Sequence, residues 1–137
     1  MNRDDFKQIA KIRLKEARTL LKNGNYDGAY YLCGYAVECG LKACIAKKTK
    51  RFDFPDEKTV KNSYTHDIEQ LVGVAGLKQD LQNEMRSNRQ FAVNWAVVKD
   101  WDEVSRYERH SDRTARDLYS AIVDRKNGVL KWIIQRW

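Results

Sequence analysis

The residues best suited to chemistry lie in one short segment, Arg106-Tyr107-Glu108-Arg109-His110. Histidine titrates near neutral pH and can move a proton, while arginine is a permanent cation that can hold a developing phosphate charge. If the segment is helical, Arg106 and His110 lie one turn apart on the same face. That pair would suit metal-independent cleavage of RNA. The alternative is that Arg106 pairs with Asp102, one turn earlier, and that His110 only precedes the next helix.

A second group of polar residues lies nearer the middle of the chain. Tyr64 and His66 could contact a phosphate group or a base, although a histidine near a helix start is also readily satisfied by a neighbouring polar group. Glu38 lies within an apolar stretch, so its carboxylate requires a partner. Lys42, one turn later, is the local candidate, and Arg106 or His66 would be more informative partners. A polar buttress that locks two helices explains Glu38 as well as a ligand site does.

The sequence indicates neither a metal site nor a cofactor. It contains two histidines and no close Cys/His cluster of the kind that binds catalytic zinc. Cys33 and Cys44 share a helix face but lie about 16 Å apart, which is too far for a disulfide. The acidic residues Asp100, Asp102 and Glu103 are explained by helix capping. No nucleotidyltransferase signature is present, so an active transferase would have to come from another chain.

A central helix over Tyr26–Lys48 organises the rest of the chain. Its apolar face consists largely of small residues, and Ala36 and Gly40, one turn apart, would let another helix approach closely. Each glycine within a helix costs about 1 kcal/mol relative to alanine, a cost that close packing can offset. Glu38 and Lys42 interrupt the apolar stretch, so it is not a membrane span.

Apolar residues recur every three or four positions along most of the chain, and there is one proline. The pattern predicts an all-α fold, an antiparallel up-and-down bundle of four main helices plus one or two short helices, in a single domain over residues 1–137. Before the central helix we expect a helix over Arg3–Lys22, and after it a loop over Thr49–Ser63 that Phe52 and Phe54 pack against the body. A short helix over Tyr64–Leu71 follows, capped by Thr65 and ended by Gly73 and Gly76, and then a long helix from Leu77 to Val98. The last expected elements are a short helix from Trp101 with an Asp100–Glu103 capping box and a final helix that is capped by Ser111 or Asp112 and bends or stops at Asn127-Gly128.

The charge of the chain is compatible with an anionic partner. Lysines and arginines number 26 against 19 acidic residues, for a net charge of +7. A positive charge of this size would attract RNA, DNA or nucleotides, although the same charge also serves solubility. The first residues are charged from the start and resemble no signal peptide, so we expect a cytoplasmic protein without a membrane partner.

Three stretches follow one another over nearly the whole chain: Gly34–Ala43, Thr65–Leu71, and Arg106-Tyr107 after Trp101. Together they resemble the HEPN domain family. The resemblance implies an up-and-down helical bundle, often a homodimer. It also implies a wide range of functions: some members resemble metal-independent ribonucleases, including toxins of toxin–antitoxin pairs, and others pair with, or are fused to, small nucleotidyltransferases and help bind nucleotide or substrate.

The ribonuclease members of the family carry an arginine and a histidine separated by about four to six residues near the last helix. The nearest match here is Arg106 and His110, with three residues between them. The leading interpretation is therefore a HEPN-type helical module that binds nucleotide or RNA and acts with a separate nucleotidyltransferase or in a toxin–antitoxin-like system. One alternative is a ribonuclease that uses Arg106 and His110; a second is a purely structural interaction module, with Ala36 and Gly40 facing a partner helix.

The leading interpretation also assigns roles to particular side chains. Glu38 and Lys42 are expected to be structural polar residues. The expected ligand-binding residues are Tyr64, His66, Arg106, Tyr107 and Arg109.

Overall fold

The computed structural model describes residues 1–51 and 56–137, and every regular element in these ranges is a helix. In chain order they are α1 (Arg3–Lys22), α2 (Tyr26–Arg51), α3 (Glu57–Asn62), α4 (Ile68–Val74), α5 (Lys78–Ser87), α6 (Arg89–Val98), the 3-10 helix η1 (Glu103–Tyr107), α7 (Asp112–Val123) and α8 (Val129–Ile134). The all-α prediction is confirmed. The expected packing of Phe52 and Phe54 lies outside the described residues.

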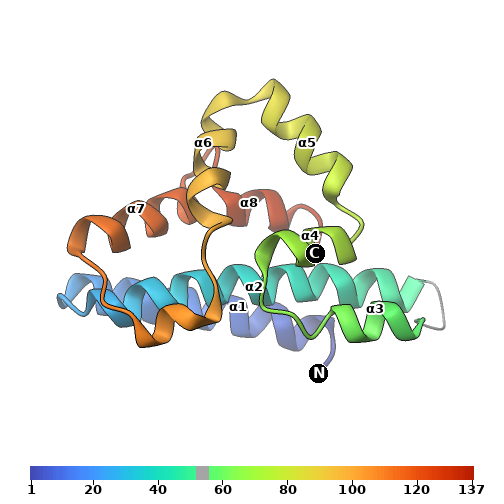
Figure 1. Cartoon of the computed structure of the whole chain (residues 1–137), viewed down its shortest axis with the longest axis horizontal. Coiled ribbons are helices and arrows are strands. Elements are labelled where there is room, and N and C mark those ends of the chain that lie inside the picture. Colours follow the sequence, from blue (N-terminus) through green and yellow to red (C-terminus); the bar gives the residue numbers. More distant parts are fainter. Residues whose placement is uncertain (52–55) are drawn as a thin grey trace.

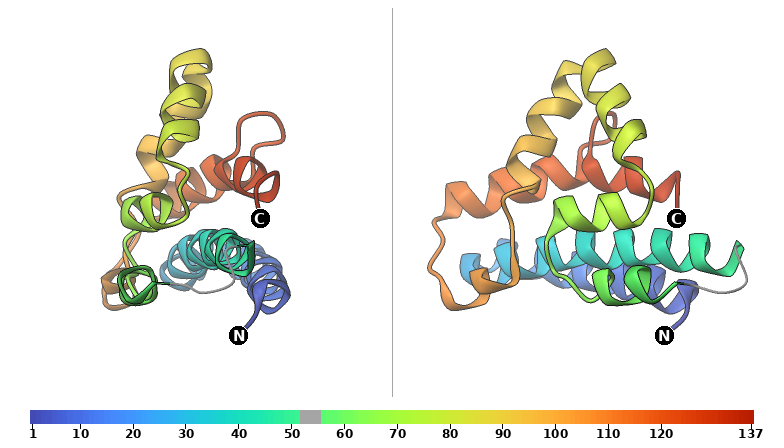
Figure 2. Two further views of the ribbon diagram at one scale, coloured as in Figure 1. Left: turned by 90° about the vertical axis from the view of Figure 1, so that its right-hand side faces the viewer. Right: turned by 45° about the vertical axis from the view of Figure 1, so that its right-hand side comes forward.

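The long helices α1 and α2 lie antiparallel beside each other, and the other elements are arranged around α2 (Figure 1). Helices α7 and α8 follow one another along one side of α2, and α4 packs near its middle. Helices α5 and α6 form an arm that projects from the body, as the two views of Figure 2 show. Helix α3 and η1 both lie along one side of α2, α3 beside its C-terminal part and η1 beside its N-terminal part.

The small residues of α2 admit their neighbours at very short range, as the sequence predicts. A Cβ atom on Gly34 would lie 2.2 Å from the ring of Trp101, and one on Gly40 would lie 3.0 Å from Cγ2 of Ile133. Trp101 is 2% exposed and Ile133 is fully buried. The neighbour at Gly40 is therefore α8 of the same chain, which covers the face that was expected to be open to a partner helix.

The expected loop over Thr49–Ser63 is wrong in part. Helix α2 continues to Arg51, and α3 occupies Glu57–Asn62. Asp56 caps α3, because its side chain accepts a hydrogen bond at 2.6 Å from the backbone N–H of Thr59.

The expected long helix from Leu77 to Val98 is also wrong, because it divides at Asn88 into α5 and α6. Asn88 has an extended backbone (φ −139°, ψ 96°), and its side chain accepts from the N–H of Phe91, which caps α6. Its amide also donates to Oδ1 of Asn127 at 2.8 Å. This tertiary hydrogen bond, from the loop between α7 and α8, holds the break that creates the arm.

The remaining helix ends differ from expectation in their caps. Asp67 caps α4 in place of Thr65, and Asp102 caps η1 in place of an Asp100 capping box. The expected cap Ser111 is confirmed.

The expected helix ends at glycines are partly confirmed. Helix α7 ends at Val123, and α8 starts after Gly128, where a Cβ atom would lie 2.5 Å from the carbonyl oxygen of Asp124. Gly73 lies inside α4, and Gly76, at φ +74°, follows the end of that helix.

Substitution Gly34→Ala should destabilise the fold strongly, because the added methyl group would overlap the Trp101 ring. We expect a loss of about 1–3 kcal/mol in the free energy of unfolding, measured by urea titration followed by circular dichroism. The matched control is Gly73→Ala, in a helix where a Cβ atom meets nothing within 4 Å. That control should be neutral or slightly stabilising, and equal losses in both variants would contradict the packing argument.

The three cysteines should be inert towards thiol reagents in the folded protein. Cys33, Cys39 and Cys44 are buried free thiols, and burial raises their pKa to about 12, about 11 and about 11 respectively. Because only the thiolate reacts readily, we expect slow labelling by a disulfide reagent at pH 8 and rapid labelling of all three in denaturant. Rapid labelling of any one thiol in the native state would show that its element opens.

Candidate functional site

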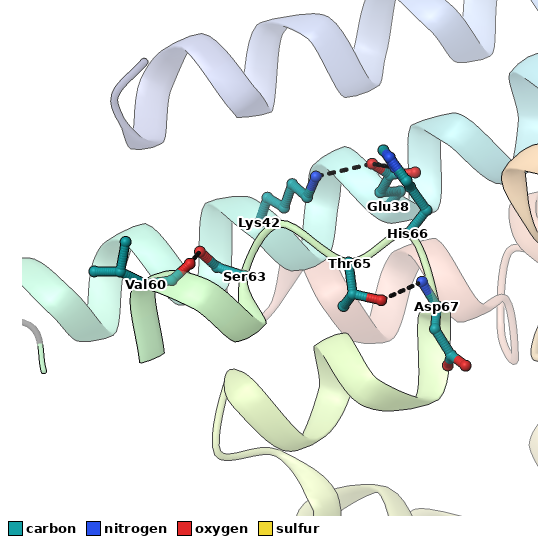
Figure 3. A network of polar contacts seen from close by, with 7 residues as sticks. All are labelled: Glu38, Lys42, Val60, Ser63, Thr65, His66 and Asp67. Atoms are coloured by element: carbon teal, nitrogen blue, oxygen red, sulfur yellow. Dashed lines mark hydrogen bonds and ion pairs between the residues drawn. The ribbon is translucent and has the colours of Figure 1, made fainter. Parts of the chain in front are cut away.

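A buried carboxylate on α2 lies at the centre of the candidate site (Figure 3). Glu38 is 2% exposed, and its Oε1 accepts hydrogen bonds from Nζ of Lys42 at 2.9 Å and pairs with Nδ1 of His66 at 2.8 Å. Its other oxygen, Oε2, is buried and finds no hydrogen-bond partner among the described residues. We call Glu38, Lys42 and His66 the polar knot. The sequence suggested Lys42 and His66 as partners of Glu38, and both contact its carboxylate.

The connection between α3 and α4 holds His66 over α2. Oγ1 of Thr65 accepts a hydrogen bond from the N–H of Asp67 at 3.1 Å, which forms a tight turn around His66. Asp67 then caps α4 by accepting from the N–H of Gln70 at 3.0 Å. Ile68, the first residue of α4, is fully buried. The turn is therefore anchored on its C-terminal side, and His66, whose side chain is 45% exposed, reaches Glu38 from the surface.

Two tyrosines of α2 extend the site from the polar knot towards η1. The rings of Tyr31 and Tyr35 lie 6.0 Å apart between centroids, and Tyr31 also stacks near Trp101 at 6.0 Å. Burial first, and then the nearby Cys39 and Glu38 side chains, raise the pKa of Tyr35. Tyr35 thus lies next to the polar knot, and Tyr31 lies next to the segment that follows Trp101.

Arg106 and Tyr107 lie at the η1 end of this row. The guanidinium carbon of Arg106 is 4.9 Å from the centroid of the Tyr107 ring. Contact with Tyr107 first, and with Tyr31 next, raises the pKa of the Arg106 guanidinium. Tyr107 is 78% exposed, and Tyr64, at the other end, is 76% exposed. We call the surface formed by Tyr64, the polar knot, Tyr35, Tyr31, Arg106 and Tyr107 the tyrosine row.

His110 follows the 3-10 helix that carries Arg106. The 3-10 helix ends at Tyr107, so the two residues do not share the helical face that their spacing would give in an α-helix. The ring of His110 is 8% exposed and stacks on Tyr30 with centroids 3.8 Å apart, whereas Arg106 is exposed beside Tyr31. The suggested pair between Arg106 and Asp102 is not among the ion pairs of the described residues.

Arg109, which is also expected at the ligand surface, forms an ion pair with α2 and has a side chain that is 94% exposed. Its Nε pairs with Oδ2 of Asp27 at 2.8 Å. Asp27, in the first turn of α2, also accepts a hydrogen bond from the backbone N–H of His110. That N–H first, together with Arg109, lowers the pKa of Asp27.

Sequence reasoning missed four of the residues that build this region: Asp27, Tyr30, Tyr31 and Tyr35. A signal for two of them was present, since Tyr31, Tyr35, Glu38 and Lys42 follow one another at helical spacing on one face of α2. No comparable signal existed for Asp27 and Tyr30, whose partners lie in a distant segment.

A cavity of about 1000 Å³ adjoins the polar knot, with Lys42 and Tyr64 among its lining residues. Its other described walls come from the start of α1, from α2 and from α3. Within the described ranges, no group of three His, Cys, Asp or Glu side chains is placed to hold a metal ion. No described helix is long and apolar enough to cross a membrane.

The fold and site define an all-helical module with a polar and aromatic surface along its central helix. The family model described as "HEPN domain" matches residues 4–137. The chain therefore belongs to the HEPN domain family. No significant match to a curated protein or to a solved structure was found.

Substitution Lys42→Met should destabilise the fold, because it leaves the buried Glu38 carboxylate with His66 as its remaining partner. We expect a loss of about 1–3 kcal/mol in the free energy of unfolding, with part of it recovered in the double variant Glu38→Gln/Lys42→Met.

The matched control for this prediction is Lys61→Met. Lys61 pairs with Glu57 across one turn of α3 at the same distance, 2.9 Å, but both side chains are more than 70% exposed. Such pairs contribute little, so this variant should unfold like the wild type. Equal losses in the free energy of unfolding at Lys42 and Lys61 would show that the Lys42–Glu38 pair contributes no more than a surface ion pair.

Proposed function

We propose that this HEPN module binds RNA or a nucleotide along the tyrosine row. The observation that carries the proposal is the combination of exposed aromatic rings and a cation in the segments that lie along one side of α2. Tyr64 and Tyr107 are more than three-quarters exposed, although tyrosine normally buries its ring. Exposed aromatic rings beside cations are typical of surfaces on which unpaired bases stack.

The polar knot would contribute hydrogen bonds to the same ligand. Lys42 is a donor near the surface, and Nε2 of His66, whose Nδ1 donates to Glu38, would accept a hydrogen bond from a ligand. Arg106 would bind a phosphate group by a charge-assisted hydrogen bond.

In this proposal the protein acts as a cytoplasmic homodimer, together with a separate nucleotidyltransferase or within a toxin–antitoxin-like system. The support for these partners is the family itself. The sequence has no nucleotidyltransferase signature of its own, so a transfer reaction would be carried out by the partner. Copurification with a small nucleotidyltransferase, followed by sizing of the complex, would test the partner.

The ribonuclease alternative has weaker support than binding. A histidine that moves a proton must reach the substrate, and the His110 ring is 8% exposed beneath its neighbours. The interaction-module alternative placed Ala36 and Gly40 against a partner, but Ala36 is fully buried and Gly40 packs on Ile133.

Substitution Arg106→Ala should weaken binding of a short fluorescein-labelled single-stranded RNA by about tenfold, because a hydrogen bond between charged groups is lost. Wild-type affinity should fall with rising salt, and the variant should show a salt slope smaller by about one. Fluorescence anisotropy at several salt concentrations measures both quantities, and the same titration with labelled ATP distinguishes RNA from nucleotide.

The control for this measurement is Arg113→Ala, since Arg113 is 92% exposed on α7 and pairs with Asp117. It removes the same charge from a residue that is not part of the tyrosine row and should change affinity by less than about twofold. If both arginine variants lose the same affinity, binding depends on net charge and not on this site. If the wild type binds neither probe, the proposed function is wrong.

A further inference from the structure

Contacts hold the ring face, Nε2 and the backbone N–H of His110. Its ring lies nearly parallel to that of Tyr30, at an interplanar angle of 14°. Its Nε2 is 3.3 Å from the carbonyl oxygen of Ser105, which can only accept, so a proton on Nε2 is bound within the chain itself. Its backbone N–H donates to Asp27, and the preceding Arg109 pairs with the same carboxylate.

These contacts fix one end of the segment that carries Arg106 and Tyr107. The other end is fixed by Trp101, which is 2% exposed and fits against Gly34. Both anchors are on α2, Gly34 one turn after Tyr30. Between them the chain forms a 3-10 turn whose outer residues, Arg106 and Tyr107, are exposed.

The ring of Tyr30 therefore packs against the core and also stacks on His110. Burial first, and then the charges of Glu108, Asp100 and Asp102, raise the pKa of Tyr30. The stack of the Tyr30 ring on His110 is a structural contact between α2 and the segment that follows η1.

We infer that Asp27, Tyr30 and His110 form a clasp that holds η1 against α2 and so presents Arg106 and Tyr107 to the ligand. The inference rests on the proposed function, because it assigns these residues a part in that binding. His110 is then a positioning residue that acts through Arg106 and Tyr107, and its role is to stack and not to transfer a proton.

The first test compares His110→Ala with His110→Phe. Phenylalanine keeps a flat ring to stack on Tyr30 but cannot carry a proton, whereas alanine removes the stack. Because a stacked aromatic pair contributes modestly, we expect His110→Ala to weaken binding of the labelled single-stranded RNA by about fivefold, and His110→Phe to stay within about twofold of the wild type. Equal losses in the two variants would overturn the clasp.

A double-variant cycle tests whether His110 acts through its neighbours. When Arg106 and Tyr107 are both replaced by alanine, adding His110→Ala should cost less than about twofold further, because the groups being positioned are already gone. A full fivefold loss in that background would show that His110 contacts the ligand independently. If His110→Ala does not fold, the same cycle is run with Asp27→Ala, with Asp27→Asn, which keeps an acceptor for the His110 N–H, as its conservative control.

The clasp can also be tested without any ligand. Hydrogen exchange of the amides over Glu103–Tyr107 should quicken in His110→Ala and remain as in the wild type in His110→Phe. Unchanged exchange in His110→Ala would refute the clasp even if RNA binds. If exchange responds as expected but the wild type binds neither RNA nor ATP, the proposed function fails while the clasp remains as a structural contact.

A cleavage assay on the same RNA probe tests whether His110 is a catalytic residue. If the wild type cleaves it and His110→Phe binds it normally but no longer cleaves, His110 is a catalytic residue and the assignment as a positioning residue is wrong. If His110→Phe and the wild type behave alike in cleavage as in binding, the clasp is supported.

Discussion

The structure depends on how closely other elements approach α2. Two glycines allow this approach: Gly34 admits the indole of Trp101, and Gly40 admits Ile133 of α8. A helix that carries glycines is locally less stable by about 1 kcal/mol for each of them, so the helix is stable here because of the surfaces that the glycines let it bury. The same close packing at Gly34 determines where η1 begins, and with it one end of the tyrosine row.

The polar knot differs from this close packing because it is held by charges and hydrogen bonds. A carboxylate that is 2% exposed would be strongly unfavourable alone. Lys42 from its own helix and His66 from the turn before α4 compensate it, and each keeps part of its side chain at the surface. The knot therefore joins a local pair to a long-range contact, and it ties the α3–α4 connection to the central helix. This arrangement leaves polar groups available at the surface beside Tyr35 and Tyr64.

Membership of the HEPN family establishes the kind of bundle but not the reaction, since the family includes both ribonucleases and partners of nucleotidyltransferases. The nearest match here to the family's arginine–histidine pair is Arg106 with His110, and the structure describes the environment of this histidine. His110 follows the 3-10 helix in extended chain and stacks on Tyr30. Three intervening residues would suffice to align Arg106 and His110 on an α-helix, but η1 is not an α-helix and ends before His110.

The sequence alone determined the features that depend on near neighbours. Apolar periodicity and the Asn23-Gly24 stop signal predicted α1 over Arg3–Lys22, Ser111 was one of two candidate caps for α7, and the spacing of Glu38 and Lys42 indicated their local pair. Tertiary structure decided the break at Asn88, the pairing of His66 with Glu38 and the stacking of His110 on Tyr30. Each of these joins residues far apart in the chain, and helical periodicity carries no information about which distant side chains will meet.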